Sequence, residues 1–177
     1  MSYRRDLWEI AAFRNGVVTV TEAEDAGVPA VEVRKLAARG VLQAYGQGVY
    51  RHLDIPATSL TEPMIAVALA GQNSYLHRES VLDLVGIGQF NPPKVRVGTR
   101  RRVRRALPEW MEIEKRSDLP DEDLTDYAGV PATTVRKALL DMRKRMPPDR
   151  WTKVVGEALR RGLIEEQDIG TEDAVSA

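Results

Sequence analysis

Apolar residues near the start of the chain recur every three or four positions, in short runs that glycines bring to an end. The first run predicts a helix over residues 3–13. A capping box over residues 21–24, Thr-Glu-Ala-Glu, predicts a second short helix that ends at Gly27. A third helix is predicted to begin at Pro29 and to stop at Gly40, because proline favours the first position of a helix and glycine follows its last.

The pattern changes after Gly40, where two β-prone stretches within residues 41–50 are joined through Gly46-Gln47-Gly48. Such a pattern predicts a small hairpin. Helix, short helix, tight turn, helix and hairpin follow one another in a winged helix-turn-helix. In that fold the third helix is free to enter the major groove of DNA, which is about 12 Å wide. We therefore predict a DNA-binding domain over residues 1–57.

The rest of the chain mixes helical and extended patterns. Residues 53–58 loosen into a linker, and a second capping box, residues 59–62, predicts that the next helix begins there. Further helices are predicted over 78–85, 132–145 and 149–161, and strands over 94–97 and 111–115. The predicted fold class is α+β, an N-terminal winged helix-turn-helix (1–57) followed by a mixed α/β domain (58–165) and an acidic tail (166–177).

The composition limits the kinds of binding and catalytic site that the protein can contain. The 177 residues include no cysteine and two histidines, which excludes disulfides, thiolate zinc sites and iron–sulfur clusters. We expect no metal and no cofactor. No apolar run approaches the roughly 18 residues of a membrane span, and the first residues lack the apolar core of a signal peptide. The protein is expected to be cytoplasmic, with no membrane partner.

Charge is balanced overall, with 26 basic and 26 acidic residues, but it is unevenly distributed. The stretch from Lys94 to Arg105 is basic and contains no acid, whereas acids cluster between Asp118 and Asp126. Three roles are open for the arginines at 100–105. They can track DNA phosphates, offer a basic surface to an acidic protein partner, or form a solvated face paired with the acidic cluster.

The expected DNA contacts lie on the third helix, the hairpin and the arginine run. Arg34 and Lys35 are candidates for guanine edges or phosphates, and Ala30 with Val31 for a thymine methyl group. Residues 1–53 carry a net charge of about +1, so tight binding is expected to need two copies on repeated operator sites. The full set of expected DNA-binding residues is Ala30, Val31, Arg34, Lys35, Arg39, Gln43, Tyr45, Gln47, Arg51, Arg100, Arg101, Arg102, Arg104 and Arg105.

An enzyme is not favoured. The carboxylates of Glu112 and Glu114 resemble those of restriction-type nucleases, but Lys115 directly follows Glu114 and therefore points to the opposite face of the strand. No catalytic residue is assigned. His77 is expected to cap or pack, and His52 has no evident partner in the sequence.

Several segments resemble the AbiEi family, the antitoxins of type IV abortive-infection toxin–antitoxin systems. The likeness runs from about Tyr3 to Ile164, and its strongest part is the second half of the chain. Its segments are Ala26-Gly27-Val28, Leu36, Gly40, Gln47-Gly48-Val49-Tyr50, the stretch 75–86, the stretch 129–142 and the stretch 158–164. The resemblance implies a DNA-binding autorepressor whose second domain neutralises a toxin, usually a nucleotidyltransferase.

Two functions of different classes follow from these observations. The first is an antitoxin that also represses its own operon, and it has operator DNA and a cognate nucleotidyltransferase toxin as partners. The second is a stand-alone transcriptional regulator whose C-terminal domain senses a ligand or dimerises. Both need the same winged helix, so the sequence does not separate them.

Overall fold

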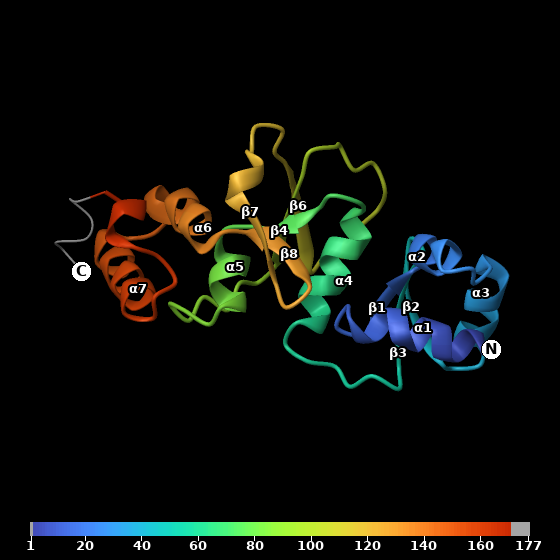
Figure 1. Ribbon diagram of the computed structural model, residues 1–177. Coiled ribbons are helices and arrows are strands. Elements are labelled where there is room, and N and C mark those ends of the chain that lie inside the picture. The colour runs from blue at the N-terminus through green and yellow to red at the C-terminus, as the bar shows by residue number, and fades with distance from the viewer. Residues whose placement is uncertain (1, 171–177) are drawn as a thin grey trace. The chain divides into compact units, whose positions relative to one another are not determined.

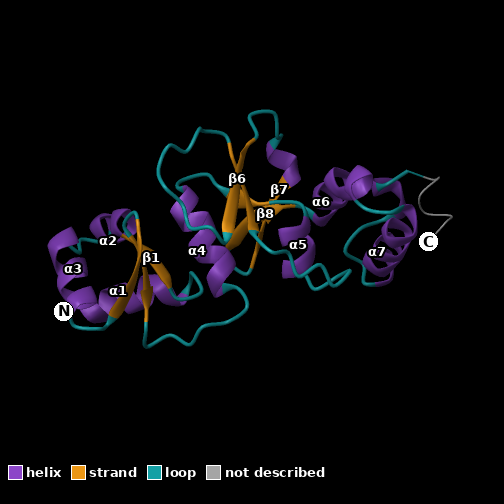
Figure 2. Ribbon diagram, turned by 180° about the vertical axis from the view of Figure 1, so that it is seen from behind, coloured by secondary structure: helices purple, strands orange, loops and turns teal. Residues whose placement is uncertain are grey.

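The computed structural model describes residues 2–170 and divides the chain into two compact units (Figures 1 and 2). The first unit runs to Ser74 and also includes Ala128–Val130. The second unit comprises Tyr75–Tyr127 and the chain from Pro131 onward. The predicted α+β class, with helices and a small sheet first and a mixed α/β part afterwards, is confirmed.

The first unit has the element order of a winged helix-turn-helix. Its three strands form an antiparallel sheet in the order β1-β3-β2, in which Val18 lies opposite Tyr50. The helices and strands are α1 (Tyr3–Ala12), β1 (Val17–Thr19), α2 (Val20–Asp25), α3 (Ala30–Ala38), β2 (Leu42–Gly46), β3 (Val49–His52) and α4 (Thr61–Ala70).

One apolar cluster holds α1, α2 and α3 against the small sheet. On α1 and α3 its buried members recur three or four residues apart, and the residues between them are mostly exposed, which is why these short helices form where the spacing predicts them. Tyr50 of β3 is partly buried and packs against the cluster. The buried members are Leu7, Ala11, Val18, Ala23, Val28, Val33, Leu36 and Leu42.

The capping box that starts α2 lies two residues before its predicted place. The Thr19 hydroxyl accepts a hydrogen bond from the Glu22 backbone amide (3.2 Å), and the Glu22 carboxylate accepts one from the Thr19 amide (2.9 Å). Thr19 and Thr21 each lie three residues before a glutamate, so either could begin a capping box. Strand β1 ends at Thr19, however, and the helix begins directly after it. Thr21 is an exposed residue within the helix.

The first unit continues past residue 57, where the sequence places the end of the DNA-binding domain. It includes α4, which begins at Thr61 without a side-chain cap, so the capping box predicted at residues 59–62 is wrong. The Thr61 hydroxyl instead accepts from the Thr58 amide (2.9 Å) and donates to the Asn15 carbonyl (3.1 Å). The functional boundary at residue 57 stays a prediction.

A turn from much later in the chain completes the first unit. Ala128 and Gly129 both have positive φ, and Ala128 accepts a hydrogen bond from the Asn15 side-chain amide (2.9 Å). A Cβ at Gly129 would lie 3.1 Å from the Phe13 carbonyl oxygen, so glycine suits this close approach.

A five-stranded sheet in the order β6-β5-β4-β8-β7 forms the centre of the second unit. Strand β4 pairs parallel with β8 and antiparallel with β5, and β5 pairs parallel with β6. The elements are β4 (Tyr75–Leu76), α5 (Glu79–Leu84), β5 (Val95–Thr99), β6 (Met111–Lys115), η1 (Asp121–Asp123), β7 (Leu124–Tyr127), β8 (Val130–Thr133), α6 (Val135–Met142), η2 (Arg143–Arg145), α7 (Pro148–Arg160) and η3 (Glu166–Asp168).

Three of these strands are absent from the sequence-based prediction, and one helix starts later than predicted. Strand β4 has two residues, and β7 and β8 have four each, so none carries a long alternating pattern. The helix predicted from Ala132 begins at Val135, because residues 130–133 form β8 and the Thr134 hydroxyl caps the helix by accepting from the Lys137 amide (3.1 Å).

The acidic tail was predicted from residue 166, but the described chain stays packed beyond that point. Residues 166–168 form η3, and Ile169 is only 3% exposed, because its apolar side chain gains by burial. Residues 171–177 lie outside the described residues, and for them the acidic tail stays a prediction.

Candidate DNA interface

Helix α3 presents one face to solvent and one to the core. Val33 and Leu36 are buried, whereas Val31, 47% exposed, is on the opposite side. Ala30 is half-buried at the edge of the exposed face. The residues that share exposure are Val31, Arg34, Lys35, Ala38 and Arg39, and we call them the α3 face. The predicted recognition residues on this helix therefore come together, with Ala30 at their border.

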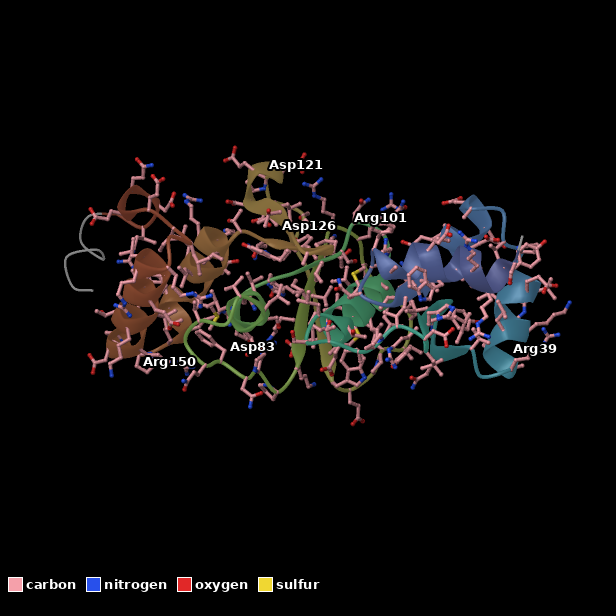
Figure 3. All side chains as sticks on the ribbon, turned by 60° about the horizontal axis from the view of Figure 1, so that its bottom comes forward. Arg39, Asp83, Arg101, Asp121, Asp126 and Arg150 are labelled. Carbon is pink, nitrogen blue, oxygen red and sulfur yellow. The ribbon has the colours of Figure 1, made fainter. Side chains whose placement is uncertain are left out.

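The cations of the α3 face differ in whether they form an ion pair. The Lys35 ammonium donates to the Glu32 carboxylate one turn earlier (2.7 Å). Among residues 2–170, neither Arg34 nor Arg39 has an ion-pair partner. Arg39 lies at the C-terminal end of α3 (Figure 3). Sequence reasoning missed the Glu32–Lys35 pair, although the spacing of three residues on a helix is the signal that finds such pairs.

The hairpin of β2 and β3 is the wing. Gln47 at its tip has a φ of 53° between two glycines that also have positive φ, which makes the tight turn possible. Gln43 and Gln47 are exposed and Tyr45 is half-buried, so these three expected contacts lie on one hairpin. Their use in DNA binding stays a prediction.

Arg51 is placed differently from the other wing residues. Its side chain is half-buried, and its guanidinium donates to the Ile55 carbonyl (3.1 Å). The guanidinium is thus engaged within the first unit, unlike that of Arg34. Nearby His52 is fully buried, and the sequence-based expectation that it lacks a partner is wrong. Its ring bonds to the Arg4 carbonyl and accepts from the Asp54 amide, both at 3.3 Å, and burial lowers its pKa.

The arginine run lies in the loop that follows β5. Arg100 donates to the Leu119 carbonyl (3.0 Å) and pairs with Asp121, which belongs to the acidic segment that Figure 3 marks with Asp121 and Asp126. For Arg100 the pairing with the acidic cluster is thus present. Within the described chain no partner is found for the side chains of the four exposed arginines that follow, Arg101, Arg102, Arg104 and Arg105.

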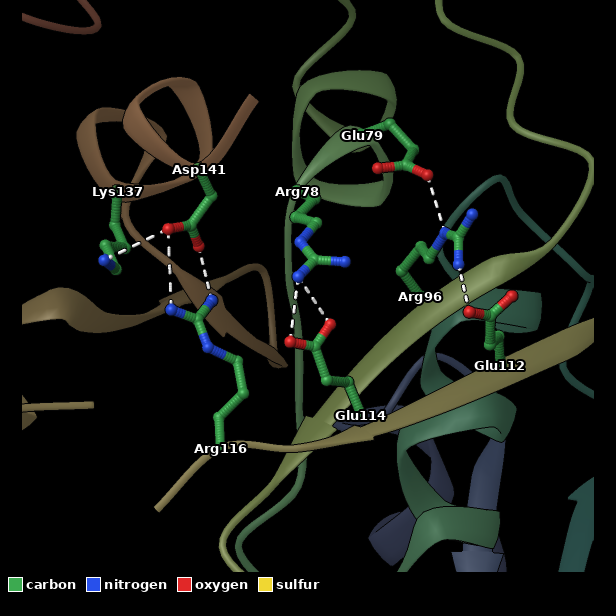
Figure 4. Close-up of polar contacts among 8 residues, drawn as sticks. All are labelled: Arg78, Glu79, Arg96, Glu112, Glu114, Arg116, Lys137 and Asp141. Atoms are coloured by element: carbon green, nitrogen blue, oxygen red, sulfur yellow. Dashed lines mark hydrogen bonds and ion pairs between the residues drawn. The ribbon is translucent and has the colours of Figure 1, made fainter. Parts of the chain in front are cut away.

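A cluster of polar residues lies on the sheet of the second unit, and its charged side chains form ion pairs with one another (Figure 4). Arg78 pairs with Glu114 (2.6 Å), while Arg96 pairs with both Glu79 (2.6 Å) and Glu112. The two carboxylates that resemble nuclease ligands are thus each held by an arginine. Sequence reasoning missed this cluster because its partners are far apart along the chain.

Asp141 of α6 joins the same cluster. Its carboxylate is bound by Arg116 and by Lys137 (3.1 Å). Burial tends to raise the Asp141 pKa, but the hydrogen bonds from Arg116 and Lys137 outweigh it and the pKa is lowered. His77 is fully buried beside these groups, and burial, with the nearby Arg78 charge, lowers its pKa to about 3. His77 is therefore a neutral packing residue at ordinary pH, as expected.

Comparison with known families bears on the first unit. Residues 5–51, from α1 through most of β3, match the family described as "Transcriptional regulator, AbiEi antitoxin". The AbiEi-type resemblance is confirmed over these residues, and for the second half of the chain it stays a prediction. The match covers the AbiEi-type segment that contains α3 and the wing, and the family is one of transcriptional regulators and antitoxins.

The chain was also compared with solved structures and with curated proteins. The chain is similar to a structure titled "Crystal structure of RV2827C protein from Mycobacterium tuberculosis", with a TM-score of 0.49 and 18% identity over 96% of this chain and 68% of that one. No curated protein matches. Within residues 2–170, no helix is long and apolar enough to cross a membrane, and no three His, Cys, Asp or Glu side chains are grouped as metal ligands.

Proposed function

We propose that this protein is the antitoxin of a type IV, AbiE-like toxin–antitoxin system and represses its own operon by binding operator DNA. The observation that carries the proposal is the solvent-exposed α3 face within the AbiEi-type segment, with Arg34 unpaired among the described residues. A helix that presents an unpaired guanidinium beside a small apolar residue has the chemistry that reads base edges in a major groove.

The partners follow from the same proposal. The first is operator DNA, at repeated sites, because the small positive charge of residues 1–53 favours two bound copies. The second is a nucleotidyltransferase toxin that the second unit neutralises. The exposed arginines of the 100–105 run add phosphate contacts to DNA binding.

Two assays test the two activities. The full chain is titrated against the DNA upstream of its own gene in a gel-shift assay, and it is co-expressed with the nucleotidyltransferase encoded by an adjacent reading frame. We expect sequence-specific retardation and restored growth. Retardation without rescue by any adjacent toxin would favour the stand-alone regulator, and rescue without retardation would remove the repressor role.

A further inference from the structure

Helix α3 carries a single acidic side chain, Glu32, at the border of the α3 face. It lies in the first turn of the helix, its side chain is 27% exposed, and it accepts a hydrogen bond from Lys35 at 2.7 Å. In recognition helices the residues near the N-terminus are those that contact base edges. A carboxylate in that position faces a polyanion, so it is unfavourable unless it meets a hydrogen-bond donor.

The major groove offers few donors. They are the amino groups of cytosine and adenine, and a carboxylate pairs with the cytosine N4 amino group. Lysine, in contrast, donates to the O6 and N7 acceptors of guanine. The 2.7 Å contact keeps an acceptor and a donor side by side on α3, and the edge of a C·G base pair presents a donor beside two acceptors.

We propose that Glu32 and Lys35 together read one C·G base pair, with Glu32 accepting from cytosine N4 and Lys35 donating to the paired guanine. This inference rests on the proposed function of α3 as the DNA-reading helix. A T·A pair in the same place presents the thymine O4 acceptor, which repels the Glu32 carboxylate, and a methyl group, which donates no hydrogen bond to it. Glu32 is thus a specificity-determining residue, and its pair with Lys35 aligns both side chains before DNA is bound.

The test uses the full chain and a library of random duplexes, from which bound sequences are selected. The variants are Glu32→Gln, Lys35→Met and the control Glu24→Gln, which removes an exposed acid from α2. We expect the unmodified chain to require C·G at one position. Glu32→Gln should reduce discrimination at that position about 10-fold and shift it toward adenine, which glutamine recognises. Lys35→Met should weaken the same position, and Glu24→Gln should leave every preference unchanged.

Two results would overturn the inference. The first is a Glu32→Gln variant that binds all sequences more tightly with unchanged preferences, because Glu32 would then act only through its charge. The second is a loss of preference at different positions in Glu32→Gln and Lys35→Met. If the unmodified chain enriches no sequence at all, the proposed DNA-reading function itself fails. Matching circular dichroism spectra and melting temperatures exclude misfolding of the variants.

Discussion

Arg34 and Lys35 are neighbours on α3, yet they differ in the charge they offer to a ligand. The Lys35 ammonium is partly offset by Glu32, whereas Arg34 has no such partner in the described part of the chain. We expect Arg34→Ala to weaken operator binding by about 1–3 kcal/mol, because an arginine at a base edge contributes about that much. On DNA of random sequence, Lys35→Ala should have the smaller effect of the two. Fluorescence anisotropy titrations measure both.

The control for these two variants is a check that each keeps the native fold. Both side chains are exposed, so circular dichroism and melting temperature should stay unchanged. If both variants bind operator DNA as tightly as the unmodified chain, α3 is not the DNA-reading helix.

His77 makes stability depend on pH in a predictable direction. Its pKa is about 3 in the folded chain, whereas in an unfolded chain a histidine titrates near 6.5. Between these values the unfolded state binds one more proton, so stability is lost as pH falls. The His77 contribution is up to about 1.4 kcal/mol per pH unit. In urea titrations at pH 6 and pH 4, His77→Gln should therefore lose stability less steeply than the unmodified chain.

The decisive quantity is the change in the free energy of unfolding between pH 6 and pH 4, because His77→Gln can also lower that free energy equally at both pH values. Parallel pH dependence of the two proteins would contradict a buried neutral histidine. Phe13, which is 86% exposed and carries no charge, offers a site for a control substitution, Phe13→Leu, that should leave the pH dependence unaltered.

The sequence alone predicts which side chains of a short helix are buried and which are exposed. Helical spacing separated buried Val33 and Leu36 from the α3 face, because one face of a short helix packs on the core. Spacing along the chain does not reveal that Arg116 meets Asp141 or that Arg78 meets Glu114. Those contacts depend on which strands and helices become neighbours in the tertiary fold.

Among the elements, the start of α2 offers the sharpest test of a local interaction. Thr19→Ala should destabilise the protein by about 1 kcal/mol, because it removes the hydroxyl that accepts from the Glu22 amide. Thr21→Ala should change stability little, since Thr21 is exposed within the helix. Thermal melting monitored by circular dichroism compares the two. Equal effects would contradict the cap at Thr19.

The elements of the first unit were predicted more fully than those of the second. Glycines and apolar spacing mark α1, α3 and the wing, because local turn chemistry fixes their ends. Strand β4 has only two residues, and β8 contains Pro131, which is unfavourable in a strand pattern. Such strands form because neighbours pair with them, so their own residues give little signal.

At the scale of the whole molecule, the arginine run has the largest expected effect on DNA affinity. Replacing Arg101, Arg102, Arg104 and Arg105 with glutamine should lower affinity for operator and random DNA alike and flatten the dependence of log affinity on log salt by about two, since each phosphate contact contributes about 0.9. Sequence preference should survive, because phosphate contacts position a protein and base contacts specify its site.

Arg100→Gln is the matched control for the run. Arg100 already pairs with Asp121, so its loss should leave the salt dependence nearly unchanged. An unaltered slope in the fourfold variant would exclude phosphate contacts. Loss of growth rescue without a change in melting temperature would then assign the run to toxin contact.

The turn at Ala128–Val130 has a consequence for the order in which the protein is made. During synthesis a chain emerges from its N-terminus, and domains that are continuous in sequence can fold as soon as they emerge. The first unit is not continuous, because the Asn15 side chain finds its partner at Ala128. A nascent chain that has reached Ser74 holds all of α3 and the wing but lacks this last piece. The unit that holds α3 and the wing is therefore completed only after about half of the second unit has been translated, so a chain that terminates before Ala128 lacks one piece of its first unit.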